Sequence, residues 1–187
     1  MDLRELDRQA MKLTGEVVSQ VRPEQLRLPT PCADWTLHGL LRHLISENLG
    51  FAAATAAGTD PSEVDWNAGR IGPDPVADYH RAADLYLDSF VPDSVLEREM
   101  RIGVFGVVPG STAVAMHFVD SVAHGWDVAK TIGVPYEPDE QLAAMALKVM
   151  KRFPSERPTV AFDVMVPIPD DASELDKFLA YVGRDPQ

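Results

Sequence analysis

Apolar residues recur along most of the chain at intervals of three and four positions, and this spacing predicts helices. The first run includes Leu3, Leu6 and Ala10. The expected helices span residues 3–20, 36–57, 75–90, 112–132, 138–152 and 172–182. Pro29 and Pro31 place the segment between the first two helices in a loop, because proline is excluded from a helix interior.

Capping residues define where several of these helices begin and end. Asp34 or Thr36 is the expected N-cap of the second helix, and Gly58 is expected to close it. Ser111, which follows Pro109-Gly110, is the expected N-cap of the helix that Gly133 ends.

Two segments have a pattern that does not fit a helix. Residues 95–109 alternate apolar and charged positions around Gly103, which predicts a small β-hairpin or an extended excursion. Residues 158–169 are expected to be extended. Four long amphipathic helices with long connections predict a mainly α protein: a four-helix bundle with crossover loops, a short β excursion and a small C-terminal α/β tail. A parallel α/β fold is disfavoured, because strand signals do not alternate with helices.

Composition and charge exclude several classes of partner. The 187 residues include 29 acids and 17 bases, which gives a net charge of -12. This balance argues against nucleic acid and against an anionic membrane surface, since both require a basic patch. The first residues lack the pattern of a secretory signal, and no apolar run reaches the length of a membrane span. We therefore expect a cytoplasmic protein.

The helix expected at 112–132 carries an unusual set of polar side chains. His117, Asp120, His124 and Asp127 fall within an arc of about 80° on a helical wheel. A solvated polar stripe is one interpretation. Such stripes favour Lys, Glu and Arg, however, whereas histidine and aspartate are weaker helix formers that bind metals well. Asp120 and His124 stand four residues apart, so their side chains can converge on one ion.

A bundle site needs a further ligand from a facing helix, and His43 on the second helix is the candidate. Three protein ligands leave coordination positions open, and this donor set suits Zn²⁺, Ni²⁺ or Fe²⁺. His38 and His80 are expected at the surface. Cys32 is alone, so it makes no internal disulfide; packing is the favoured interpretation and a thiol nucleophile the alternative.

The sequence resembles the mycothiol-dependent maleylpyruvate isomerase N-terminal family, which belongs to the DinB-like superfamily. Within this family it resembles a branch of shorter, actinobacterial-type chains. Three segments carry the resemblance: 30–44 (TPCADWTLHGLLRHL), 109–133 with its DSVAHGWDVAKTIG end, and 166–186 (VPIPDDASELDKFLAYVGRDP). The resemblance covers nearly the whole chain in order. It predicts one DinB-like domain over 1–187, with a metal-binding bundle in 1–133 and a C-terminal extension in 134–187.

The resemblance implies a metal bound by His43, Asp120 and His124, with zinc as the expected ion and nickel or iron as alternatives. It also implies a low-molecular-weight thiol such as mycothiol as cosubstrate. Two features depart from the isomerase. Its acid is one methylene longer than Asp120, so the site here must close up or add a water, and its C-terminal domain is larger.

The preferred hypothesis is a metal-dependent thiol S-transferase or isomerase-like enzyme, acting with this thiol on an electrophilic small molecule. Three further side chains are candidates for lining the pocket or for hydrogen bonding to a ligating imidazole: Glu47, His117 and Asp127. His117 is also a candidate for moving a proton. The alternative is a non-catalytic bundle that binds a metal or a small molecule. A third interpretation is an interaction protein that forms a homodimer through its helix faces.

Overall fold

A computed structural model of the chain describes residues 2–32, 35–153 and 162–186. The chain divides into two compact units, Met1–Pro135 and Tyr136–Gln187. Within the described ranges the fold is mainly helical with one two-stranded sheet, which confirms the predicted class. The sequence placed the division after residue 133, and the interpretation of both units as one domain stays a prediction.

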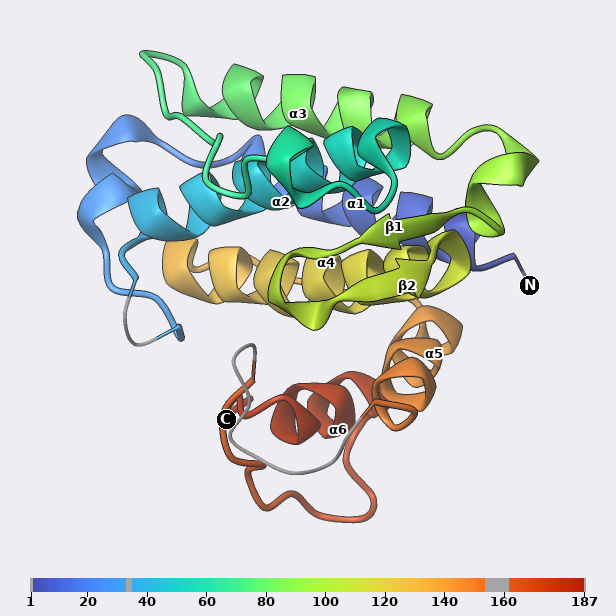
Figure 1. Cartoon of the computed structure of the whole chain (residues 1–187). Coiled ribbons are helices and arrows are strands. Elements are labelled where there is room, and N and C mark those ends of the chain that lie inside the picture. The colour runs from blue at the N-terminus through green and yellow to red at the C-terminus, as the bar shows by residue number, and fades with distance from the viewer. Residues whose placement is uncertain (1, 33–34, 154–161, 187) are drawn as a thin grey trace. The chain divides into compact units, whose positions relative to one another are not determined.

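The first unit is built around four long helices (Figure 1). They are α1 (Leu3–Val18), α2 (Leu37–Ala57), α3 (Pro75–Ser89) and α4 (Gly110–Ile132). Helix α1 packs on α4 and α3, and α2 packs on α3 and α4, so the order around the bundle is α1, α4, α2, α3. The helices α1 and α2 are therefore diagonal partners, as are α3 and α4, and the connections between them cross the bundle as predicted.

Short 3₁₀ turns and a hairpin occupy the connections. The turns are η1 (Pro23–Arg27), η2 (Pro61–Glu63), η3 (Asp93–Leu96) and η4 (Gly103–Phe105). The strands β1 (Glu99–Arg101) and β2 (Val107–Pro109) pair antiparallel with Met100 opposite Val108, which confirms the expected β excursion. Met100 and Ile102 are buried, and the Arg101 N–H donates to the Gly58 carbonyl, so the hairpin is attached to the end of α2.

Most helix ends follow the capping residues, with one correction. Thr36 occupies the N-cap position of α2, and Gly58 ends this helix with φ of +63°. Gly133 ends α4 in the left-handed conformation. The prediction that Ser111 caps α4 is wrong, because the helix already begins at Gly110 with Pro109 at the cap position. A Cβ at residue 110 would collide with the Val95 carbonyl oxygen, so glycine allows α4 to start against this neighbouring segment.

A buried polar network links all four helices at the centre of the bundle. It contains one side chain from each helix: Asp7 of α1, Asn48 of α2, Tyr86 of α3 and His117 of α4. His117 lies with Nδ1 2.9 Å from Asp7 Oδ1 and with Nε2 3.0 Å from Asn48 Oδ1. The Tyr86 hydroxyl donates to the other Asp7 oxygen, and its ring stacks on the His117 ring at 3.6 Å. Burial and the Asp7 carboxylate raise the pKa of Tyr86 well above 10.0, so its O–H stays a donor.

The second unit contains α5 (Glu140–Met150) and α6 (Glu174–Tyr181), which pack together. Ser173 caps α6, so this helix begins two residues later than expected. Residues 158–161 of the expected extended segment lie outside the described residues, and 162–169 form no regular strand. The Val166 N–H donates to the Ala180 carbonyl, which holds this segment against α6. The α part of the predicted α/β tail is therefore present, and no strand accompanies it between 162 and 186.

In the described ranges, no helix combines the length and the apolar character that crossing a bilayer requires.

We expect Tyr86→Phe to lower the free energy of unfolding by about 1–3 kcal/mol, because it removes a donor from the buried Asp7 carboxylate and leaves packing unchanged. Urea denaturation followed by circular dichroism measures this loss. Leu85→Ala, on the same helix but 55% exposed, is the control and should change stability by no more than about 0.5 kcal/mol. Equal stabilities for wild type and Tyr86→Phe would contradict a stabilising role for the network.

Candidate metal centre

Two helices supply the side chains of the candidate site. On α2, His43 and Glu47 stand one turn apart beside the buried Leu40 and Leu44. On α4, Asp120 and His124 also stand one turn apart, and they face His43 across the bundle. The structure thus brings together the three residues that the sequence singled out as ligands.

The three donor atoms are spaced as ligands of one ion. Asp120 Oδ1 lies 3.6 Å from His43 Nε2 and 3.4 Å from His124 Nε2. Ligands about 2.0–2.1 Å from a tetrahedral ion lie about 3.3–3.4 Å from one another. The three atoms all lie within 4.8 Å of one another. The Asp120 side chain is therefore long enough to bring one oxygen within 3.6 Å of both imidazoles.

His43 Nε2 supplies a second sign that the donor set fits a cation. This atom is buried, and within the described part of the chain it makes no hydrogen bond. A buried polar atom without a hydrogen bond costs free energy, so such atoms usually indicate an ion, a water or a ligand. An ion bound between His43, Asp120 and His124 would satisfy this nitrogen.

The charges around the donors favour a cation. Burial alone would raise the pKa of Asp120, but the neighbouring His124 and His43 hold it well below 3.8. Burial would likewise lower the pKa of His124, but the Asp120 and Asp127 carboxylates raise it well above 6.5. Burial, together with the Asp120 charge, raises the pKa of Glu47 to about 7. Asp120 therefore places a negative charge at the point where the donors converge.

Both imidazoles of the candidate site have a carboxylate near their second nitrogen. His124 Nδ1 lies 2.8 Å from Asp127 Oδ2, within hydrogen-bond distance. His43 Nδ1 lies 3.7 Å from Glu47 Oε1. An Nδ1–H held by a carboxylate leaves the Nε2 lone pair directed at the site, which is the usual arrangement around a metal-binding histidine.

A second group of ligand types, Cys32, His124 and Asp127, lies behind His124. Cys32 Sγ is 3.4 Å from Asp127 Oδ2, and the hydrogen bond between His124 and Asp127 already pairs two of the three groups. We therefore assign this group to the support of His124. Packing was the favoured expectation for Cys32, with a thiol nucleophile as the alternative. Trp35, whose ring centroid lies 4.6 Å from that of His43, was not among the expected site residues. Cys32 and Trp35 both lie shortly before the helix that carries His43, and this position was the signal in the sequence that could have identified them.

The remaining histidines lie apart from the three donors. His117 was a candidate for hydrogen bonding to a ligating imidazole. In the structure it instead belongs to the polar network with Asp7 and Asn48. His38 is exposed, and the half-buried His80 lies 2.9 Å from the Ser19 hydroxyl. The alternative interpretation of the α4 stripe as a solvated face does not hold, because His117, His124 and Asp127 are buried.

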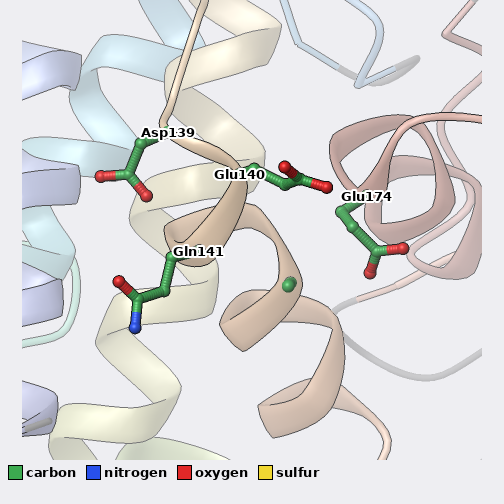
Figure 2. A pocket seen from close by; sticks show the side chains of 5 residues that line it. Asp139, Glu140, Gln141 and Glu174 are labelled. Carbon is green, nitrogen blue, oxygen red and sulfur yellow. The ribbon is translucent and has the colours of Figure 1, made fainter.

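An open depression in the second unit is a weaker candidate (Figure 2). It is lined by Asp139, Glu140, Gln141, Ala144 and Glu174. Its carboxylates lie at the N-terminal ends of α5 and α6, where they cap or favourably meet the helix dipoles. Neither an imidazole nor a thiol lines it, so the chemistry points to the first unit.

Comparison with known proteins agrees with this location. Residues 8–129 match the family model described as the mycothiol maleylpyruvate isomerase N-terminal domain, and this range includes all three donors. Two curated but uncharacterised proteins, from two strains of Mycobacterium tuberculosis, are each 26% identical over 188 residues, with 98% of this chain and 98% of theirs covered. No solved structure matches the chain.

We expect Asp127→Ala to cost about 3–5 kcal/mol of unfolding free energy in metal-free protein, because it removes a buried carboxylate from beside His124. Chemical denaturation in the presence of a chelator measures this loss. Asp127→Asn keeps an acceptor oxygen and should lose less. A stability of Asp127→Ala equal to that of wild type would show that the buried pair contributes nothing.

Proposed function

We propose that this chain, which belongs to the mycothiol maleylpyruvate isomerase N-terminal domain family, binds one divalent metal ion at His43, Asp120 and His124. With it, the protein would act as a thiol S-transferase or isomerase-like enzyme that uses a low-molecular-weight thiol such as mycothiol. The observation that carries the proposal is the convergence of two imidazole nitrogens, His43 Nε2 at 3.6 Å and His124 Nε2 at 3.4 Å, on Asp120 Oδ1.

The nitrogen and oxygen donors suit zinc, with nickel or iron as alternatives. When bound, such an ion lowers the pKa of a coordinated thiol, so that the thiolate is available near neutral pH. Three protein donors leave room for this thiol beside them. The side chains of His43, Glu47 and Asp120 are each 22% exposed, so one side of the site faces solvent.

The chain's own residues orient the reactants. Asp127 fixes His124 through Nδ1, which keeps Nε2 directed at the site. The Trp35 ring packs against both imidazoles, with its centroid 4.6 Å from that of His43 and 5.9 Å from that of His124. Glu47 lines the site beside His43. A thiolate held here would add to one carbon of an electrophilic C=C bond of a second small molecule, and the π electrons of that bond would take up a proton at the other end. In conjugation the C–S bond is kept. In isomerisation the single C–C bond rotates, the proton leaves and the thiolate is expelled as the double bond re-forms. A reduced thiol cosubstrate also agrees with a cytoplasmic location.

The alternative function is a non-catalytic bundle that binds a metal or a small molecule. One observation favours it. The matched family is an N-terminal domain, and the match ends at residue 129, so residues 130–187 lie outside it. Turnover that needs groups outside the matched range would therefore depend on residues 130–187, whereas metal binding would depend on the matched range alone.

We expect the protein, purified without chelators, to hold about one divalent ion per chain, and His124→Ala to lose it, because removing one of three protein donors opens the site. Elemental analysis by mass spectrometry measures the content. His38→Ala, an exposed histidine on α2, is the matched control and should retain the ion. A wild-type protein without stoichiometric metal would overturn the metal site.

We expect metal-loaded protein to accelerate the reaction of mycothiol with a bimane electrophile, and His43→Ala to lose this rate, because the donors then no longer hold the ion beside the thiol. Product fluorescence after separation measures the initial rate. His38→Ala again serves as the control. Metal-loaded protein with no rate above background would leave the binding protein as the function.

A further inference from the structure

The thiol of Cys32 lies next to the residue that orients His124. Its Sγ is 3.4 Å from Asp127 Oδ2, and the same oxygen lies 2.8 Å from His124 Nδ1. The Asp127 side chain is fully buried, so each donor to its carboxylate offsets part of the desolvation cost, even a weak S–H donor. Cys32 belongs to the segment before α2, whereas Asp127 belongs to α4. Their contact therefore joins the two parts of the chain that carry the metal donors.

Backbone hydrogen bonds hold this segment in a closed shape. The Leu37 N–H donates to the Leu28 carbonyl at 2.9 Å, and Pro29 and Thr36 form an isolated β-bridge. Inside the loop, the Cys32 carbonyl accepts from the Trp35 N–H and from the Thr30 hydroxyl, both at 2.9 Å. These bonds set the position of Trp35 relative to that of Cys32.

Cys32 and Trp35, which we call the clasp, contact the two ligand histidines from different sides. The Trp35 ring centroid lies 4.6 Å from that of His43 and 5.9 Å from that of His124. Cys32 lies behind His124, with Sγ 3.9 Å from Nδ1. Because the Trp35 N–H donates to the Cys32 carbonyl, the contact between Cys32 and Asp127 also helps to hold Trp35 against the imidazoles.

We propose that Cys32 is a positioning residue for the metal centre, and that the clasp slows the loss of the bound ion; this rests on the proposed metal site. An ion leaves when an imidazole turns away from it or when a competing ligand approaches. Trp35 restrains His43 and His124 and covers them, and Cys32 anchors the loop that carries Trp35. Loss of the thiol contact loosens both restraints, so the ion dissociates faster.

The test is the rate at which excess chelator removes Co²⁺ from the loaded full-length protein, followed by the visible absorption of the ion. Outer contacts of metal ligands typically change metal affinity by about 10–100-fold, so we expect release from Cys32→Ala to be about tenfold faster. Cys32→Ser keeps a donor and should stay within about threefold of wild type. Thr30→Val removes the hydroxyl bond to the Cys32 carbonyl, leaves the thiol in place, and should also speed release.

A double-variant cycle tests whether Cys32 and Trp35 slow ion release together, as one clasp, or independently of each other. Trp35→Ala should release the ion faster than wild type, and adding Cys32→Ala should change its rate little, because both residues act through one loop. Val18→Ala, a buried position on α1 outside the clasp, lowers stability and should keep the wild-type rate.

Equal release rates for wild type and Cys32→Ala would overturn the positioning role and leave the metal site intact. The same conclusion would follow if Val18→Ala released the ion as fast as Cys32→Ala at an equal loss of stability, because lower stability alone would then explain the faster release. A wild-type protein that takes up no Co²⁺ would overturn the proposed function itself. If Cys32→Ala does not fold, Thr30→Val decides the question. A wild-type release rate from Thr30→Val would then contradict the proposal.

Discussion

A polar network buried at the centre of an apolar bundle can be satisfied in very few arrangements, and the bundle depends on this constraint. Asp7, Asn48, Tyr86 and His117 come from four different helices, and each is at most 2% exposed. Moving any helix by one turn would leave a charged or polar group buried without its partner, at a cost of several kcal/mol. Leu, Val and Ala contacts tolerate such shifts far better. The network therefore fixes the register of the four helices.

That register also places the candidate metal donors. Asn48 lies on α2 near His43, and His117 lies on α4 one turn before Asp120. The contact between Asn48 and His117 at 3.0 Å fixes how far α2 and α4 are displaced along each other. Asp120 can then meet His43 and His124 with one oxygen. The protein uses one pair of helices twice: deep in the bundle for stability, and nearer the surface for the site.

Much of this could be predicted from the sequence, because helical spacing and four-residue pairs are local properties. The helices, the hairpin and the pairing of Asp120 with His124 all follow from short stretches of chain. His117 shows where this reasoning ends. A helical wheel shows direction around the axis only, and His117 is about 10 Å along the axis from His124, since each residue rises 1.5 Å. Its partner Asp7 lies on α1, which no local pattern on α4 could reveal.

The other differences have the same kind of cause. Ser111 is a good capping residue by type, but the start of α4 is set by the space that Gly110 leaves beside Val95. Cys32 has no periodic pattern around it, and its contact with Asp127 depends on how a proline-containing loop folds back. Such loop contacts follow from the tertiary structure, so a search for helical spacing misses them.

The placement of the donors on two helices that lie far apart in the sequence has a further consequence. His43 and Asp120 are separated by the rest of α2, all of α3 and the hairpin, so an ion held by both would act as a cross-link that closes a long loop. Cross-links of this kind reduce the conformational entropy of the unfolded chain, and an ion that binds only the folded state adds its binding free energy to stability. The amount of folded protein in a cell would then follow the supply of the metal as well as the temperature.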